Sequence, residues 1–311
     1  MEDAAVLEEL APKLGTLFDR HLSMTKEWFP HKLVPWARGA DLDVEADWTG
    51  EAMPLPDAVR SALFVNLLTE DNLPYYFETI NRVFRSEAWD EWSRRWTAEE
   101  MRHSFVIRDY ITVSDALDPI ELERARMAQV SLGQVPQPES VADGLVYVAL
   151  QELATRISHR NTGKVLDDPV GYTVMARVAA DENLHFMMYR DLVTAALELD
   201  PSGTVLAIER QVRNFEMPGG GIPGFAKHAA AIAAAEIYDL AIHHDQILVP
   251  VVLRHWKVED LTGLSDEAEK ARDSLLNRIE RIGKVAKKLA SRRPGHSETG
   301  ASAPEEVSAA V

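Results

Sequence analysis

The chain has 311 residues, of which 46% are hydrophobic and 27% charged, so it can bury one large core or two small ones and is neither disordered nor collagen-like. Its formal net charge of −17 at pH 7 argues against general binding to nucleic acid or to anionic membrane surfaces. The sequence contains no cysteine, which excludes disulfides, thiolate zinc sites and cysteine-ligated iron–sulfur clusters. Any metal chemistry must therefore use carboxylates and imidazoles.

The N-terminal segment MEDAAVLEEL is acidic and has neither the basic start and apolar stretch of a signal peptide nor the arginine bias of a transit peptide. The most apolar segments, 229–235 and 247–253, are far shorter than the roughly 20 residues that cross a bilayer. These features predict a soluble, cytoplasmic protein without a membrane span.

Helical periodicity dominates the chain, without a series of alternating short strands or hairpin signals, and predicts an all-α fold. A helix after Pro56 carries an apolar face that continues to Glu70, and Pro74 should bend the chain just beyond it. The next helix, over about 89–112, places Glu100 and His103 on an apolar stripe. That stripe also contains Trp92, Trp96, Ile107 and Tyr110. A short helix beginning at Pro119 then leads to a break over 133–138.

Two further long helices are predicted over 140–160 and 168–199, and each again has polar residues on its apolar face. The first stripe contains Leu145, Ala149, Glu152, Thr155 and His159, and the second contains Met175, Val178, Glu182, His185, Tyr189, Leu192 and Ala196.

The remaining sequence predicts shorter elements followed by a tail. A helix after Pro201, a glycine-rich break over 217–224, an alanine-rich helix over 226–242, a segment over 247–256 and a basic amphipathic helix over 265–291 follow in order. We therefore expect a single domain over 1–291. Residues 292–311 lack periodicity and are predicted to be a disordered tail.

Two Glu-x-x-His motifs, Glu100 to His103 and Glu182 to His185, place an oxygen and a nitrogen ligand one turn apart on one helix face. Chance alone gives roughly one such spacing in this composition, so either motif alone is weak evidence. The arrangement is repeated, however, because Glu70 lies 30 residues before Glu100 and Glu152 lies 30 residues before Glu182. The repeat predicts a pseudo-symmetric four-helix bundle.

A bundle interior that receives four glutamates and two histidines requires a compensating cation, because burial of isolated carboxylates is costly. Four carboxylates and two imidazoles suit two irons or manganeses in a ferritin-like dinuclear site. Salt bridges from basic residues are an alternative, but the apolar stripes offer few of them. The histidines could instead be hydrogen-bonded core residues, and the aromatic residues could serve packing alone.

At four segments, the sequence resembles the soluble acyl-acyl-carrier-protein desaturases, particularly their actinobacterial branch. The similarity extends from about His21 to the alanine-rich helix near 240, and the motifs occur in the order of the family. The segments are Leu68–Pro74 (LTEDNLP), Trp96–His103 (WTAEEMRH), Gln151–Thr162 (QELATRISHRNT) and Ala180–His185 (ADENLH).

The resemblance implies a set of functional residues. Thr155 corresponds to a threonine beside the oxygen-binding side of the cluster, although its hydroxyl could equally bond its own helix backbone. Asp181 and Trp28 correspond to an electron route that reaches iron through His103; from the sequence alone, they would be an exposed acid and a packing residue. The implied iron ligands are Glu70, Glu100, His103, Glu152, Glu182 and His185, with Glu100 and Glu152 or their equivalents as bridges.

Three positions depart from the plant-type pattern of the family. Met101 stands in place of an asparagine, and Leu153 and Leu184 stand in place of arginines. None is an implied ligand. The two missing arginines would change local charge and the preference for acyl chain or partner, so the position of the double bond does not carry over.

The resemblance implies an oxygen-dependent desaturase of fatty acid biosynthesis that acts on a saturated acyl chain carried by acyl carrier protein. It implies two irons, O₂ as co-substrate, electrons from an external ferredoxin and a homodimer. Because the chain has no cysteine for an iron–sulfur relay, its electrons would come from a separate protein. An acidic carrier would need a local basic surface on this acidic chain. The candidates are Arg156, Arg160 and Lys164, or Arg278, Arg281, Lys284, Lys287 and Lys288, of which the second group could be a solvated helix face.

Other functions remain open at this point. A ferritin-like iron oxidase or storage protein would need only the bundle, and the additional helices after Pro201 argue against it. A ribonucleotide reductase subunit or a hydrocarbon hydroxylase would use a similar cluster, but the desaturase-like segments disfavour both. A protein that binds acyl carrier protein without turnover is the non-enzymatic alternative.

Overall fold

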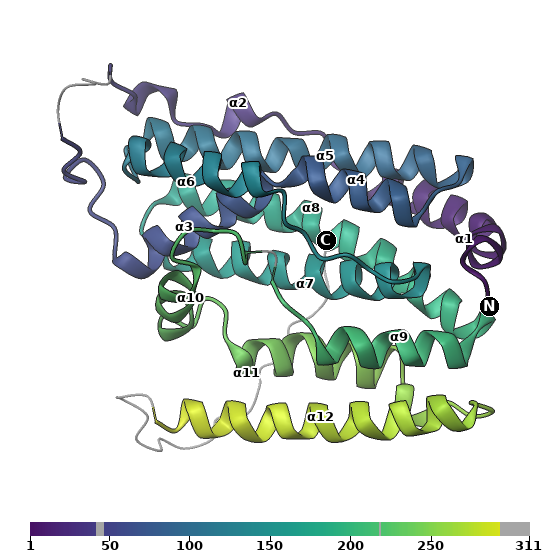
Figure 1. The fold of residues 1–311 in the computed structure, drawn as a ribbon. Helices are drawn as coiled ribbons and strands as arrows, with labels where there is room; N and C mark the ends of the chain where they lie inside the picture. Colours follow the sequence, from purple (N-terminus) through teal and green to yellow (C-terminus); the bar gives the residue numbers. More distant parts are fainter. Residues whose placement is uncertain (42–46, 218, 293–311) are drawn as a thin grey trace.

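The computed structural model describes residues 1–41, 47–217 and 219–292, and within them every regular element is a helix. The predicted all-α fold is confirmed. Four helices form the central bundle, namely α3 (Asp57–Glu70), α5 (Glu87–Val113), α7 (Val141–Val165) and α8 (Pro169–Leu199) (Figure 1). The predicted tail lies outside the described residues except for Arg292.

Local sequence explains where several of these helices begin. Asp118, Asp168 and Asp200 each stand before a proline that occupies the first helical position. Each aspartate side chain accepts a hydrogen bond from a backbone N–H of the first turn. An aspartate cap followed by proline is a favourable start, because proline has no N–H to leave unsatisfied and its φ is already helical. These pairs begin α6 (Pro119–Leu132), α8 and α9 (Pro201–Arg213).

The apolar core is divided into two large clusters along the bundle. On α5, the first cluster ends at Trp96 and the second begins at Val106. On α8, the second cluster ends at Val178 and the first resumes at Phe186, so the two helices run in opposite directions. The predicted ligand residues of both helices lie between these limits. A polar layer therefore separates two apolar blocks of the same bundle.

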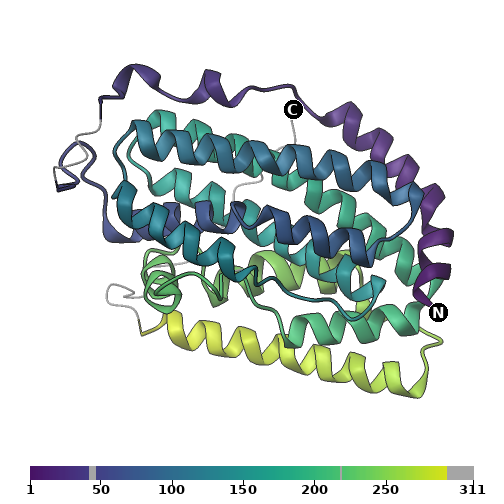
Figure 2. The same ribbon diagram turned by 45° about the horizontal axis from the view of Figure 1, so that its top comes forward.

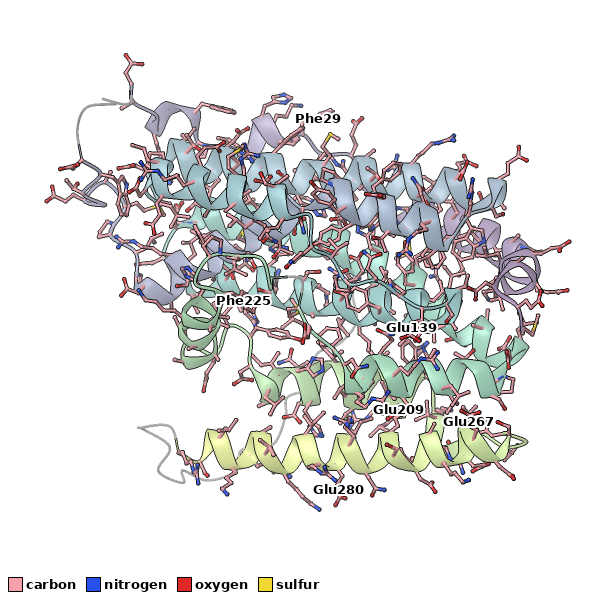
Figure 3. The ribbon with its side chains drawn as sticks, viewed as in Figure 1. Phe29, Glu139, Glu209, Phe225, Glu267 and Glu280 are labelled. Atoms are coloured by element: carbon pink, nitrogen blue, oxygen red, sulfur yellow. The ribbon has the colours of Figure 1, made fainter. Side chains whose placement is uncertain are left out.

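Further helices surround the bundle. In Figures 1 and 2, α1 (Asp3–Met24) follows one edge of the bundle, and α12 (Asp266–Ala290) forms an outer layer beneath α9. Glu209 lies between α9 and α12, where it accepts a hydrogen bond from Ser274 Oγ at 3.1 Å, whereas Glu280 points away from the molecule (Figure 3). The helix α4 (Leu73–Val83) packs on α5 and α7, and α10 (Phe225–Ala234) packs on α3.

The alanine-rich segment is not one helix over 226–242, so that expectation is wrong. It divides into α10 and the short α11 (Leu240–His243), with Glu236 between them at a φ of 56°. Asp239 starts the second helix by accepting a hydrogen bond from the N–H of Ile242. A π-helix, η2 (His244–His255), follows directly and contains Pro250, whose missing N–H is incompatible with regular α-helical bonding. No helix of the described residues is long and apolar enough to cross a membrane.

The cap of α8 gives a stability prediction. Asp168 is buried, accepts hydrogen bonds from Tyr110 Oη at 2.9 Å and from Arg38 at 2.8 and 3.0 Å, and also caps the helix. Asp168→Ala should lower the free energy of unfolding by about 2–4 kcal/mol, because it removes a cap and leaves a buried hydroxyl without its acceptor. Denaturant titration measures this loss, and a change below about 0.5 kcal/mol, typical of ordinary surface substitutions, would contradict it.

The same carboxylate gives the sign of a pH effect. Although burial opposes ionisation, the hydrogen bonds from Arg38 and Tyr110 lower the pKa of Asp168 from 3.8 to about 2. Its stabilising contribution is therefore complete above pH 3.8 and is lost as the pH falls through about 2. In Asp168→Asn this part of the acid dependence of unfolding should disappear.

Candidate metal centre

The six predicted ligands converge in the polar layer. Glu70 is the last residue of α3, Glu152 lies on α7, and α5 and α8 each contribute one Glu-x-x-His motif. All six are buried, and Glu100, at 8%, has the largest exposed fraction. The two motifs face each other, since each histidine lies within 4 Å of the glutamate of the other motif.

The ligand atoms form two overlapping groups, in each of which the atoms lie within 4.8 Å of one another. One group contains Glu70 and His103, and the other contains Glu152 and His185. Glu100 and Glu182 belong to both groups. The arrangement is thus two adjacent sites, each with one histidine and one glutamate of its own and two glutamates in common.

Both imidazoles turn Nδ1 toward this layer. His185 Nδ1 lies 2.7 Å from Glu100 Oε1 and 3.6 Å from Glu152 Oε2. His103 Nδ1 lies 3.4, 3.5 and 3.7 Å from carboxylate oxygens of Glu100, Glu182 and Glu70, respectively. Oxygen and nitrogen ligands therefore face a common centre from opposite walls of the bundle.

The donor set fits a pair of cations. Several of its buried atoms have no hydrogen-bond partner, namely Glu152 Oε2, Glu182 Oε2 and His103 Nδ1. Among the described residues, no lysine or arginine nitrogen lies within 4.0 Å of the four glutamates; their ion-pair partners are all histidines. The alternative that basic residues neutralise these carboxylates is therefore wrong, whereas oxygen and imidazole ligands suit iron or manganese.

The electrostatics of the layer show the same need for positive charge. Burial, together with the negative charges of Glu182 and Glu100, raises the pKa of Glu152 well above its ordinary value. Although burial opposes it, interaction with the neighbouring carboxylates raises the pKa of both His103 and His185 well above 6.5. The buried carboxylates of the layer therefore favour positive charge beside them, which metal ions would supply.

Asp181 lies behind His103, on the side away from the ligand group. Its Oδ2 is 3.6 Å from His103 Nε2 and accepts hydrogen bonds from Trp28 Nε1 at 2.7 Å and from Arg102 at 3.2 Å. Arg177 pairs with its other oxygen. Asp181 is 1% exposed, so its interpretation as an exposed acid is wrong, and Trp28 is a hydrogen-bonding residue as well as a buried one. The structure thus brings Trp28, Asp181 and His103 together.

A corresponding carboxylate behind His185 was not identified from the sequence. Glu99 Oε2 lies 3.0 Å from His185 Nε2 and 2.9 Å from His21 Nε2, and all three residues are buried. Arg95 donates to Glu99 Oε1 at 2.7 Å. Although burial opposes ionisation, the hydrogen bonds from His185 and His21 hold the pKa of Glu99 far below its ordinary value. Its position next to Glu100 in the sequence was the available signal.

A third imidazole, His159, also reaches the ligands. Its Nε2 lies 2.8 Å from Glu70 Oε1 and 3.5 Å from Glu182 Oε1. Although burial opposes the charged form, hydrogen bonds with Glu182 and Glu70 raise the pKa of His159 to about 9. The apolar stripe of α7 predicted its inward position but not this contact.

Thr155 lies one turn from Glu152 on the same buried face. Its hydroxyl donates to the carbonyls of Gln151 and Glu152 at 3.2 and 3.1 Å, so it does bond its own helix. It also lines a small pocket together with Glu70 and His159, which places it beside the ligands.

A second narrow pocket lies on the Trp96 side of the layer and is mostly apolar. Trp96 donates from Nε1 to Glu152 Oε1 at 3.0 Å, so this indole does more than pack. Other residues that line the pocket are Tyr76, Ile80, Val83, Phe84, Gly144, Tyr147 and Val148. Pockets therefore adjoin the ligand layer on two sides, and α7 forms a wall of both.

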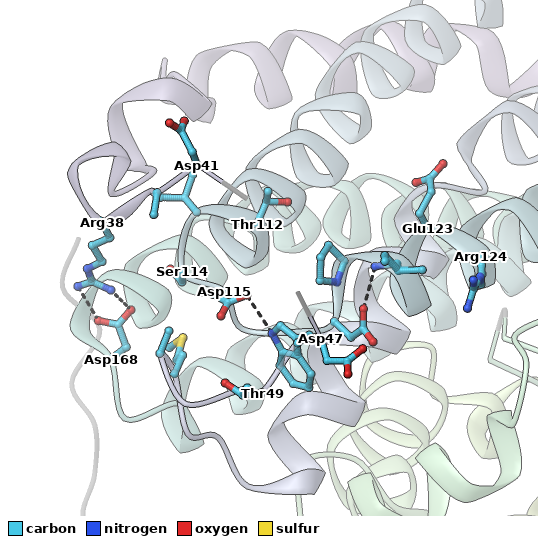
Figure 4. Close-up of a pocket in the computed structure, with 18 of the residues that line it drawn as sticks. Arg38, Asp41, Asp47, Thr49, Thr112, Ser114, Asp115, Glu123, Arg124 and Asp168 are labelled. Carbon is cyan, nitrogen blue, oxygen red and sulfur yellow. Dashed lines mark hydrogen bonds and ion pairs between the residues drawn. The ribbon is translucent and has the colours of Figure 1, made fainter. Parts of the chain in front are cut away.

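A much larger cleft lies elsewhere. It has a volume of about 1370 Å³ and includes the ion pair of Arg38 with Asp168 and the hydrogen bond of Trp48 with Asp115 (Figure 4). None of the six ligands lines it. Size alone therefore does not identify the reactive centre of this protein.

The remaining predicted positions lie outside the ligand layer. Met101 is 45% exposed, Leu153 is buried and Leu184 is half-buried, and none belongs to either ligand group. The two sets of candidate docking residues lie on different helices. Arg156, Arg160 and Lys164 are exposed on α7, whereas Arg281, Lys284, Lys287 and Lys288 are exposed on α12 and Arg278 is half-buried there.

This chain is similar to several known proteins. A family model described as "Fatty acid desaturase" matches residues 2–306. A protein of Mycobacterium tuberculosis H37Rv, named "Putative acyl-[acyl-carrier-protein] desaturase DesA1", is 41% identical over 286 residues, covering 88% of this chain and 84% of its own. The "Stearoyl-[acyl-carrier-protein] 9-desaturase 6, chloroplastic" of Arabidopsis thaliana is 32% identical over 257 residues, covering 76% of this chain and 65% of its own.

The fold also matches a solved structure. The X-ray structure of DesA2 from Mycobacterium tuberculosis H37Rv superposes with a TM-score of 0.69 at 24% identity, covering 86% of this chain and 99% of that chain. This match supports the predicted ferritin-like fold.

The ligand geometry predicts the metal content. Aerobically purified protein should contain close to two irons per chain by elemental analysis, because the ligand groups form two adjacent sites. Glu100→Ala and Glu182→Ala should each lose most of the iron while keeping most of the helicity measured by circular dichroism. Glu91→Ala, an exposed position on the same helix as Glu100, is the control and should keep it. A wild-type protein that is folded and free of metal would contradict the dinuclear site.

Proposed function

Because this chain belongs to the fatty acid desaturase family, we propose that it introduces a cis double bond into a saturated acyl chain carried by acyl carrier protein, in fatty acid biosynthesis. The observation that carries the proposal is the buried pair of ligand groups in a chain whose relatives are named acyl-carrier-protein desaturases. Localisation in the cytoplasm and homodimerisation remain predictions.

We assign the metals of this centre as two irons. Glu70 and His103 would hold one, Glu152 and His185 would hold the other, and Glu100 and Glu182 would bridge them, since they alone belong to both groups. This assignment replaces Glu152 with Glu182 as the second bridge. When bound, the irons would activate O₂, which with two external electrons and two protons would take two hydrogens from the acyl chain and be reduced to water.

The protein would guide the acyl chain of the substrate along α7, past the metal ligands. The pocket beside Thr155 and His159 lies on one side of the layer, and the apolar pocket beside Trp96 lies on the other. We propose that the chain enters by the first and ends in the second, where apolar walls exclude water from the reacting carbons. The side of Thr155 that carries the hydroxyl would face the reacting carbons of the acyl chain.

Two protein partners follow from this chemistry. An external ferredoxin would supply two electrons, and the contacts of Trp28, Asp181 and His103 offer it a route from near the surface to the ligands. The acidic acyl carrier protein would dock on the exposed basic residues of α7, which also forms a wall of both pockets. These docking residues are Arg156, Arg160 and Lys164.

The direct test is a reconstituted reaction. The full-length protein should convert saturated acyl carrier protein thioesters into products lighter by two hydrogens when it receives ferredoxin, ferredoxin reductase, NADPH and O₂, as measured by mass spectrometry. A reaction without O₂ is the control and should leave the substrate unchanged. A product with one added oxygen would identify a hydroxylase, whereas iron oxidation or carrier binding without any product across chain lengths would favour a storage or binding role.

The apolar pocket predicts how chain length is limited. A Cβ on Gly144 would lie 2.9 Å from Val83 Cγ1 and 3.2 Å from Phe84 Cζ, so a side chain there would narrow the pocket. Gly144→Ala should lower kcat/KM for the longest accepted chain by about tenfold relative to a chain two carbons shorter. Gly15→Ala, in α1, where an added Cβ has no atom within 4 Å, should leave the ratio unchanged. An unchanged ratio in Gly144→Ala would place the end of the chain elsewhere.

A further inference from the structure

The two ligand histidines differ in the contact that Nε2, the ring nitrogen turned away from the ligand groups, makes with a carboxylate. His185 Nε2 donates to Glu99 at 3.0 Å, whereas His103 Nε2 lies 3.6 Å from Asp181, beyond hydrogen-bond distance. The Asp181 oxygen that faces His103 already accepts hydrogen bonds from Trp28 and Arg102. The orientation of His185 is therefore fixed by a direct hydrogen bond that His103 lacks.

Glu99 accepts on both of its oxygens. Arg95 occupies Oε1 through Nε at 2.7 Å and Nη2 at 2.5 Å, and arginine can only donate. The other oxygen, Oε2, receives His185 Nε2 and His21 Nε2. Since an ionised carboxylate offers acceptors alone, both imidazoles must carry their hydrogen on Nε2. This leaves the lone pair of His185 on Nδ1, the atom that faces Glu100 and Glu152.

His21 reaches this cluster from α1, outside the four-helix bundle. It lies near the C-terminal end of that helix and is 3% exposed. Its ring stacks on that of His185, with centroids 5.8 Å apart and planes 17° apart, and meets Trp92 edge-on. The position of α1 along the bundle therefore fixes the position of a ligand through two hydrogen bonds.

We propose that Glu99 and His21 are positioning residues that hold His185 in the tautomer and orientation required for metal binding, with Arg95 determining which way Glu99 presents its oxygens. The inference rests on the metal centre of the proposed function and assigns a role to residues of α1 and α5 outside the ligand set. Carboxylates that accept from a metal-binding histidine commonly change metal affinity by 10–100-fold when they are replaced.

Glu99→Gln tests the tautomer directly. Because Arg95 only donates, the amide oxygen of Gln should turn toward Arg95 and its NH₂ toward the two imidazoles. Both imidazoles would then accept at Nε2 and carry their hydrogen on Nδ1, which blocks the nitrogen of His185 that faces the metal. The size and shape of the side chain would hardly change.

A second substitution should reverse the effect. In the double variant Arg95→Met, Glu99→Gln, the amide oxygen is free to turn toward the imidazoles and restore hydrogen on Nε2. Arg102 is the other arginine near Glu99 Oε1, and it lies 3.8 Å away, too far for a hydrogen bond. A merely structural role for Glu99 predicts the opposite, because removing Arg95 would then add a second loss.

The experiment is an anaerobic titration of metal-free, full-length protein with Fe(II), with chelator competition to measure each affinity. The wild type and the control Glu91→Gln, exposed on the same helix, should bind two irons tightly. Glu99→Gln should bind one of the two irons 10–100-fold more weakly, and the double variant should regain most of that loss. Circular dichroism and thermal unfolding of the metal-free proteins show whether each variant is folded.

The other outcomes separate this inference from the proposed function. A wild type that binds no iron would overturn both. If the wild type binds two irons, two results would overturn the positioning role alone. One is that Glu99→Gln binds both irons as tightly as the wild type does. The other is that the double variant binds iron more weakly than Glu99→Gln does. A third iron that is present in the wild type and lost in His21→Leu would show that His21, Glu99 and His185 form a separate metal site, which also overturns it.

Discussion

The structure depends on one constraint, the burial of four carboxylates and two ligand imidazoles between two apolar blocks of a single bundle. These side chains are shielded from solvent by apolar residues on both sides of the layer. Trp96 and Phe186 lie on one side, and Val106 and Val178 lie on the other. Burying these charges without compensation would cost more than a small domain gains on folding. Two divalent cations would balance four carboxylates and make the layer neutral.

The two carboxylates behind the ligand histidines, Asp181 and Glu99, are neutralised by arginines that lie outside the polar layer. Asp181 pairs with Arg102 and Arg177, and Glu99 pairs with Arg95. These arginines stay outside the ligand groups, so they neutralise the supporting carboxylates without competing for the metals. Each ligand histidine thus faces the centre with Nδ1 and an anion with Nε2, a combination that increases the basicity of the imidazole.

Sequence predicted the part of this arrangement that depends on helix periodicity. The stripes predicted the buried, inward positions of the six candidate ligands and of His159, because spacing along one helix determines which residues share a face. The sequence did not predict Glu99 or His21, since the first is next to a ligand but turned about 100° around the helix, and the second contacts it across 78 residues of chain. Hydrophobic periodicity also did not predict two backbone features. The break in the alanine-rich segment occurs at Glu236, which has a left-handed backbone conformation, and the π-helix contains Pro250.

A consequence for selectivity follows from the use of α7 as a wall of both pockets. From Thr155, beside the ligands, to Gly144, in the apolar pocket, the helix spans eleven residues, or about 16 Å. Glu152 lies between them and accepts a hydrogen bond from Trp96, so in the proposed path one helix would position both the end of the acyl chain and a metal ligand. The distance from the reacting carbons to the end of the chain is then set by a helix that cannot shift without moving a ligand. Differences among related proteins in the preferred length of the acyl chain should therefore come from side-chain size in this pocket, as at Gly144, Val83 and Phe84, rather than from displacement of α7.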